Sequence, residues 1–178
     1  MSKPINKYLS FDITLHKTLS EFNQLPSGQV TSLDNLLSIL HDNWLSLGYN
    51  SKKEEDIYKM RAVTTLIKYY YNPKDKGEEN ILIDKFIKAR EDKNIYFAKI
   101  DKLHFLDEDT LEVIDYKSGW HIPPKSHIYN SNKVYQTLFC IYSKFGCFPQ
   151  QYSFYYLRHN FKYTMTINEI FLKRNFKT

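Results

Sequence analysis

The spacing of apolar residues separates a helical N-terminal part of the chain from a strand-rich remainder. Apolar residues recur at helical spacing over Phe11–Leu25, and a second stretch of this kind opens at the start of Ser32–Gly48 and closes at its glycine. Ser51 and Glu54 have the spacing of a capping box, which opens a third helix that ends at Tyr71, before an Asn-Pro pair. The first 72 residues are therefore predicted to be mainly helical.

Short runs rich in β-branched and aromatic residues replace this pattern after a charged turn at residues 74–80. The acidic turn Asp107–Asp109 separates two of these runs, so we expect a hairpin there. A helix capped by Ser131 and ended by Gly146 interrupts the runs once. The predicted strands cover Ile81–Lys88, Ile95–Leu103, Leu111–Tyr116, Gln151–Leu157 and Lys162–Ile167, and the helix covers Asn132–Phe145.

This order of elements predicts a mixed α/β fold of the α+β kind. Residues 80–178 are expected to form a central mixed β-sheet with one crossing helix, and residues 1–72 to add an N-terminal helical region, so that helices flank the sheet. A length of 178 residues suits a single domain over residues 1–178. The sequence contains no internal repeat or low-complexity linker that would mark a domain boundary.

The composition favours a folded protein and is compatible with a polyanionic partner. Hydrophobic residues make up 42% of the chain, which supplies a core and argues against a disordered chain. The formal net charge of +5 suits binding to DNA, and it equally suits a surface that is merely soluble. No apolar run approaches the roughly 20 residues that span a bilayer, and Met1–Leu9 lacks a signal-peptide core. We therefore expect a cytoplasmic protein without a membrane partner.

Two cysteines and the lack of one phosphate-binding motif exclude several kinds of site. Cys140 and Cys147 lie seven residues apart, which suits neither a disulfide framework nor a zinc knuckle. We interpret both as ordinary buried or half-buried thiols. The sequence also lacks a Gly-rich phosphate loop followed by Lys-Ser or Lys-Thr, so the chain carries no ATP motor. A helicase or other repair or defence protein that works with it would be a separate chain.

The residues with the most specific chemistry are those of an acid-x-Lys tripeptide, which occurs twice. Glu91–Lys93 lies in a charged turn between predicted strands and is interpreted as solvated surface. Asp115–Lys117 instead ends an apolar strand and is followed by Ser-Gly, where the chain leaves a sheet. Because alternate residues of a strand share a face, Asp115 and Lys117 are expected to project the same way.

Asp101 lies near the end of the preceding strand, and a hairpin can bring its carboxylate beside that of Asp115. Two adjacent carboxylates repel each other unless a cation lies between them, and hard oxygen ligands with room for water suit Mg²⁺ or Mn²⁺. Such an ion can activate water for phosphodiester hydrolysis while Lys117 orients that water or stabilises the phosphate charge. The same three residues are equally compatible with a salt-bridge cluster at the end of a sheet.

Three segments together resemble the RecB-type branch of the PD-(D/E)XK nucleases. They are Ala98–Lys102, Leu111–Gly119 and Gln136 in the following helix. That branch includes the nuclease domains of RecB and AddB and the CRISPR-associated adaptation nucleases. The similarity extends from about His16 to about Tyr156. It implies a restriction-endonuclease-like core and metal-dependent cleavage of DNA.

The resemblance also implies a role for individual residues. Lys117 would be the catalytic lysine, and Gln136 would help to position DNA or that lysine. Taken alone, His16 lies beside an apolar stripe and would more often be a core or capping histidine. Only the order of the motifs indicates a metal ligand. The implied metal ligands are His16, Asp101, Asp115 and the backbone carbonyl of Tyr116.

Several positions depart from the family pattern. His104 stands where an Asp-Arg-x-Asp run has its second aspartate, and Cys140 replaces the tyrosine of Gln-x-x-x-Tyr, with Tyr135 and Tyr142 close by. An acidic residue expected in the first strand corresponds to Asp84. Family members with an iron-sulfur cluster use four cysteines, so no cluster is expected here.

The leading prediction is therefore a Mg²⁺- or Mn²⁺-dependent deoxyribonuclease, an exonuclease or end-processing enzyme in DNA repair, recombination or CRISPR-type defence. Its substrates would be single-stranded DNA or duplex ends. The alternatives are a catalytically silent nuclease-fold domain that binds nucleic acid or acts as a scaffold, and a small protein-interaction domain. The basic residues predicted to contact phosphates are Lys85, Lys88, Arg90, Lys125, Lys133, Arg158 and Lys162.

Overall fold

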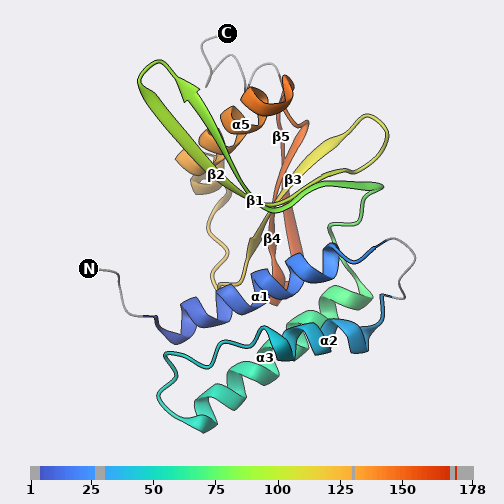
Figure 1. Ribbon diagram of the computed structural model, residues 1–178, viewed down its shortest axis with the longest axis vertical. Helices are drawn as coiled ribbons and strands as arrows, with labels where there is room; N and C mark the ends of the chain where they lie inside the picture. Colours follow the sequence, from blue (N-terminus) through green and yellow to red (C-terminus); the bar gives the residue numbers. More distant parts are fainter. Residues whose placement is uncertain (1–4, 27–30, 130, 169–170, 172–178) are drawn as a thin grey trace. The chain divides into compact units, whose positions relative to one another are not determined.

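The structure, a computed structural model, describes residues 5–26, 31–129, 131–168 and 171 (Figure 1). Its internal contacts divide the chain into two compact units. The first, called here the helical unit, comprises residues up to 74 together with residues 116–120 and 156–161. The second, called the sheet unit, comprises residues 75–115, 121–155 and those from 162 onward. The helical unit thus contains the predicted helical region and two short segments from the second half of the chain.

Three α-helices and one 3₁₀ helix make up the helical unit. They are α1 (Lys7–Asn23), α2 (Leu33–Asp42), α3 (Lys52–Tyr71) and η1 (Leu157–His159). The three α-helices pack on one another, and η1 packs on α3. Their apolar stripes form a core in which Leu15, Leu19 and Leu66 are fully buried. The third helix begins and ends where the sequence predicts. The Ser51 hydroxyl caps its start by accepting a hydrogen bond from the backbone N–H of Glu54.

The prediction that the second helix extends to Gly48 is wrong, because α2 ends at Asp42. The Asn43 side chain donates a hydrogen bond to the carbonyl of Ile39 and so closes the last turn. Gly48 serves another purpose. Its φ is +76°, and a Cβ at this position would lie 2.5 Å from the Cα of Asn6, so a glycine is needed for the close approach of two backbone segments.

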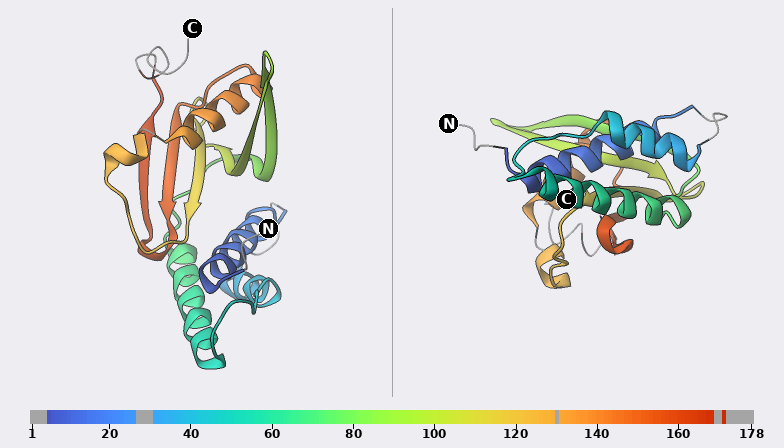
Figure 2. Two further views of the ribbon diagram at one scale, coloured as in Figure 1. Left: turned by 90° about the vertical axis from the view of Figure 1, so that its left-hand side faces the viewer. Right: turned by 90° about the horizontal axis from the view of Figure 1, so that it is seen from below.

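The sheet unit is built on a five-stranded mixed sheet in the order β1-β2-β3-β4-β5, which confirms the predicted mixed α/β class. One long helix, α5 (Asn132–Phe145), connects β3 to β4 and packs on β1 and β2, as the left view of Figure 2 shows. A short helix, α4 (Lys125–Tyr129), precedes it and was not predicted. The strands are β1 (Glu79–Glu91), β2 (Asn94–Phe105), β3 (Leu111–Lys117), β4 (Gln151–Tyr156) and β5 (Phe161–Thr166).

The hairpin predicted around the acidic turn is present in this unit, and a second hairpin, which was not predicted as such, joins β1 to β2. β1 pairs with β2 and β2 with β3, each antiparallel. The Asp107 carboxylate accepts hydrogen bonds from the backbone N–H groups of Asp109 and Thr110, which closes the turn before β3. Strands β1 and β2 are longer than predicted because their exposed residues continue to pair as far as Glu91 and Asn94. Among the described helices, none is long and apolar enough to cross a membrane.

Candidate functional site

Asp101 and Asp115 occupy neighbouring positions in the sheet unit. Lys102 pairs with Ile114 in the antiparallel register of β2 and β3. One further step along each strand places Asp101 opposite Asp115, and residues opposite each other have Cβ atoms about 4.5–5.5 Å apart. Both side chains are buried, with exposures of 9% and 3%. The hairpin therefore holds two carboxylates side by side in a largely dry environment.

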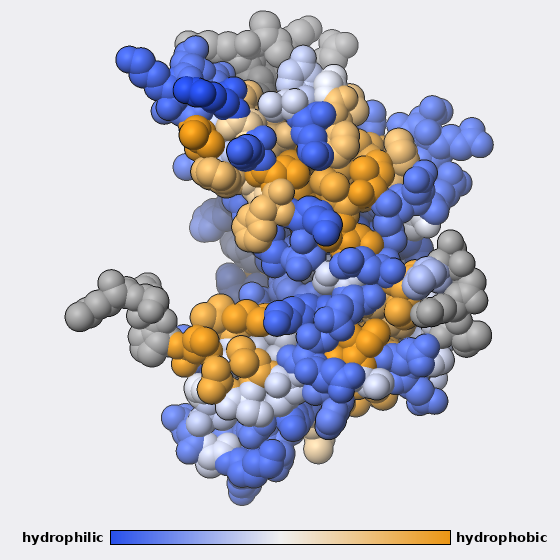
Figure 3. Space-filling view, in the orientation of Figure 1, coloured by the Kyte–Doolittle hydropathy of each residue, from blue (hydrophilic) through white to orange (hydrophobic). Residues whose placement is uncertain are grey.

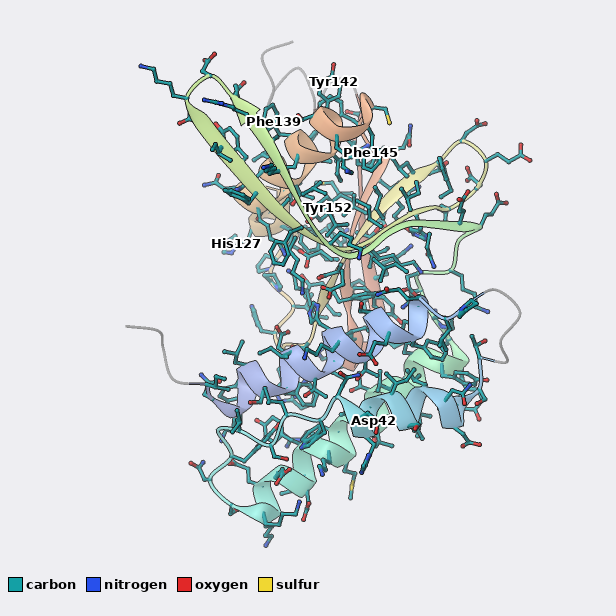
Figure 4. All side chains as sticks on the ribbon, in the orientation of Figure 1. Asp42, His127, Phe139, Tyr142, Phe145 and Tyr152 are labelled. Atoms are coloured by element: carbon teal, nitrogen blue, oxygen red, sulfur yellow. The ribbon has the colours of Figure 1, made fainter. Side chains whose placement is uncertain are left out.

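Two side chains from other elements contact this pair of carboxylates. The ammonium group of Lys133, on α5, lies 3.0 Å from the Asp115 Oδ2, and the hydroxyl of Tyr152, on β4, lies 3.5 Å from the same oxygen. Burial raises the pKa of Tyr152 well above its usual value, and the negative charges of Asp115 and Asp101 raise it further. Tyr152 is therefore a protonated donor that both carboxylates influence, and Figure 4 shows it at the centre of the sheet.

Gln136 and Cys140 hold α5 against the β1–β2 hairpin. The Gln136 side chain donates a hydrogen bond of 2.9 Å to the backbone carbonyl of Phe97 on β2. Cys140 is fully buried, and its thiol contacts the backbone of Ala89 on β1. Burial raises the pKa of this thiol, which makes it an inert core residue, whereas Cys147 is exposed. Cys140, which stands where the Gln-x-x-x-Tyr motif has its tyrosine, thus has a packing role.

The two tyrosines considered as replacements for that tyrosine each stack on another aromatic ring. The Tyr135 ring lies 5.7 Å from that of Phe171, centroid to centroid. The Tyr142 ring lies 4.5 Å from that of Phe148, and Figure 4 shows Tyr142 toward the end of α5. Both tyrosines therefore have packing roles in the sheet unit.

Asp84 lies on β1 at a point of unusual backbone conformation. Its φ is +50°, which is rare for a residue other than glycine. The flanking residues of β1 pair with Lys102 and Ile100, so that Asp84 falls opposite Asp101 in the register. Its carboxylate lies 2.8 Å from the ammonium group of Lys99. Asp84 is therefore a neighbour of the carboxylate pair whose charge is compensated by a lysine.

A second polar cluster lies in the helical unit around His16. The Nε2 atom of His16 lies 3.4 Å from the Asp12 Oδ1, one helical turn earlier on α1, and the Ser118 hydroxyl donates a hydrogen bond to that oxygen. The ring of Tyr116 meets that of His16 edge to face at 6.1 Å. Sequence reasoning missed Asp12, although its spacing of four residues before His16 on a helix was a usable signal.

The charge on Lys117 also acts on Asp12. Burial raises the pKa of the Asp12 carboxyl, but hydrogen bonds from His16 and Ser118 and the positive charge of Lys117 outweigh it, so that the pKa lies below its usual value. Asp12 is thus ionised near neutral pH. Lys117 is the last residue of β3, and the boundary between the two units falls in this strand, between Asp115 and Tyr116.

Most of the basic residues predicted to contact phosphates have partners within the protein. Lys133 lies at Asp115, Lys162 lies 2.9 Å from a Glu112 carboxylate oxygen, and Lys125 lies over the ring of Tyr163 at 5.0 Å. Arg158, in the helical unit, lies 4.3 Å from the centroid of the Phe11 ring. It also lines a pocket of about 310 Å³ with Trp120 and residues of α3. Lys85, Lys88 and Arg90 are exposed on β1.

His104, one of the departures from the family pattern, belongs to a sealed polar network in the sheet unit. Its Nε2 lies 3.0 Å from the Glu112 carboxylate, and neither side chain is exposed. Ser153 and Lys162 also bind Glu112. Burial raises the pKa of Glu112, but these three partners outweigh it and hold the pKa below its usual value.

Neighbouring residues of a strand point to opposite faces of a sheet. Tyr152 reaches Asp115 and Ser153 reaches Glu112, so the carboxylate pair and the sealed network lie on opposite faces.

The donor set of the carboxylate pair fits a small divalent ion. Mg²⁺ usually binds one or two carboxylates of the protein and completes its coordination shell with water and substrate phosphates. Asp101 and Asp115 would be these two carboxylates. Within the described ranges, no group of three or more His, Cys, Asp or Glu side chains lies close enough to hold a metal ion. Comparison of the chain with protein-family models and with curated proteins finds no match.

Proposed function

We propose that the protein is a Mg²⁺- or Mn²⁺-dependent deoxyribonuclease in which Asp101 and Asp115 hold the ion. The observation that carries this proposal is the antiparallel register of β2 and β3, which sets two buried carboxylates opposite each other. The motif resemblance supplies the reaction, hydrolysis of DNA phosphodiester bonds. It also favours an exonuclease or end-processing enzyme in repair, recombination or CRISPR-type defence.

The residues around the pair have separate tasks in this proposal. A bound ion would polarise the scissile phosphate and lower the pKa of a water molecule. Tyr152 remains protonated and directs its hydroxyl toward Asp115, which restricts the orientation of that carboxylate. Lys133 balances the negative charge of Asp115. Lys117 is proposed as the catalytic lysine, and the ligand roles of His16 and the Tyr116 carbonyl stay predictions.

Cleavage of end-labelled and circular DNA tests the proposal. The purified chain is incubated with single-stranded, linear duplex and circular DNA in Mg²⁺, in Mn²⁺ and in a chelator. Cleavage is expected only with metal, and Asp115→Asn or Lys117→Ala is expected to lower its rate by about 100-fold or more. The matched control is Asp109→Asn, an exposed carboxylate in the turn of the same hairpin. Equal rates for Asp115→Asn and the parent would refute the proposed site.

The second candidate function is a catalytically silent domain that binds nucleic acid or acts as a scaffold. It is favoured by the lysine that already compensates Asp115 and by the lack, within the described residues, of a third His, Cys, Asp or Glu close enough to complete a metal site. This candidate predicts DNA binding that weakens steeply with salt, without cleavage in any metal. Binding that is unchanged by Asp101→Asn, together with no cleavage, would select it.

A further inference from the structure

The β1–β2 hairpin carries an exposed apolar surface that the core does not require. Phe86 is 76% exposed, Phe97 59% and Ile95 57%. The other face of the hairpin is the one that packs on α5, where Ile87, Ala89 and Ala98 are buried. Large apolar side chains that remain exposed next to a complete core indicate a binding surface.

Each of these apolar residues lies opposite a cation on the neighbouring strand. Phe86 pairs with Lys99, Lys88 with Phe97, and Arg90 with Ile95. Directly paired residues share a face of the sheet, and positions two apart on one strand share it as well. The six side chains therefore form one surface, called here the hairpin face, on which aromatic or aliphatic groups alternate with positive charges.

Figure 3 shows apolar and hydrophilic side chains mixed over the upper left of the view, where Figure 1 shows this hairpin. Asp84, two residues before Phe86 on β1, is paired with Lys99. Lys88 and Arg90, both exposed, therefore supply the positive charge of the hairpin face. It ends at Lys99, two residues before Asp101 on the same strand.

We infer that the hairpin face binds single-stranded DNA. Unpaired bases stack on aromatic side chains regardless of sequence, while neighbouring cations contact the phosphates. Phe86 and Phe97 are diagonal neighbours, about 7–8 Å apart, and suit two bases of one strand. A duplex offers no free base faces to these rings. The inference rests on the proposed function for the kind of polymer that is bound.

Binding of fluorescein-labelled dT12, followed by anisotropy in a chelator, tests the inference without any contribution from cleavage. Phe86→Ala and Phe97→Ala are each expected to weaken binding about ten-fold or more, and Phe86→Tyr to retain it. Lys88→Ala is expected to reduce the salt dependence of binding. The matched control is Phe145→Ala, since Phe145 is also exposed and also has a lysine, Lys144, over its ring, but lies on α5.

Several outcomes overturn the inference. They are equal binding by the parent, Phe86→Ala and Phe97→Ala; equal affinity for a 12-base-pair duplex; and Phe86-dependent binding of polyglutamate in place of dT12. Phe86-dependent binding by a protein that cleaves nothing would support the hairpin face and refute the proposed nuclease, whereas cleavage with unchanged binding in Phe86→Ala would do the opposite.

Discussion

Two ionic clusters lie on opposite faces of the same sheet and differ in their access to solvent. The sealed network joins Glu112 to His104, Ser153 and Lys162, and neither Glu112 nor His104 is exposed. The other cluster joins Asp115 to Lys133, whose side chain is 51% exposed. A sealed charge with several donors has a structural role, whereas buried carboxylates beside an exposed lysine remain within reach of a ligand. Breaking the first should therefore cost stability, and breaking the second should cost activity.

The largest expected effect on stability comes from Glu112→Ala. Removing one partner of a buried ion pair leaves the others unsatisfied, which costs about 3–5 kcal/mol of the free energy of unfolding. Asp115→Asn keeps a hydrogen-bonding side chain and relieves the repulsion between two adjacent buried carboxylates, so it is expected to change the free energy of unfolding by about 1 kcal/mol or less. Urea denaturation of the two variants measures the difference. Equal losses in both would remove the distinction between the clusters.

Gly77→Ala is expected to disturb the sealed network from the backbone side. A Cβ at this position would lie 2.2 Å from the His104 Nδ1 and 2.3 Å from the Phe105 carbonyl oxygen. One of these groups must move, which we expect to destabilise the protein by about 1–3 kcal/mol. Thermal denaturation checks this value, with Gly119→Ala as the control, because a Cβ there meets no atom within 4 Å. A melting temperature equal to that of Gly119→Ala would contradict the packing.

The sealed network also predicts a dependence of stability on pH. The folded pKa of Glu112 lies below its ordinary value of 4.5, so its stabilising contribution is present above that value and is lost as the pH falls through the folded pKa. Glu112→Gln cannot ionise and lacks this contribution. The difference in melting temperature between the parent and this variant is therefore expected to shrink between pH 7 and pH 3. A constant difference would show that the ionised carboxylate is not the stabilising form.

The smallest expected effect on stability belongs to Lys133→Met. A half-exposed ion pair contributes about 1 kcal/mol or less, because solvent screens it. The variant should fold like the parent, and without the competing ammonium group Asp115 should bind Mn²⁺ more tightly. Calorimetric titration with Mn²⁺ measures this change. Tighter binding would support a metal site at Asp115, and weaker binding would indicate that Lys133 organises it.

Local signals in the sequence predicted the elements whose boundaries depend on nearby residues. The Asp107 turn and the Ser51 cap are formed within four residues, and both were found. The end of α2 was placed at Gly48 because a glycine commonly ends a helix, whereas this glycine is required by a close approach to Asn6, which is distant in the sequence. Hydrogen bonds between nearby residues produce recognisable sequence patterns, whereas the close approach of two distant segments does not.

The candidate site shows the same division. The pairing of Asp101 with Asp115 follows from a hairpin and could be anticipated. The partnership of Asp12 with Ser118 joins residues far apart in the chain. Lys162 was interpreted as a phosphate contact on charge alone, whereas it lies at the buried Glu112, which belongs to another strand.

The most direct test of the central claim is a crystal structure of the protein grown with Mn²⁺, with anomalous diffraction data. The claim that Asp101 and Asp115 form a metal-dependent catalytic site predicts an anomalous peak in contact with both carboxylates, and its loss in Asp115→Asn. Electron density with Lys133 at Asp115 and no peak at either carboxylate, at an Mn²⁺ concentration that supports DNA cleavage, would contradict it.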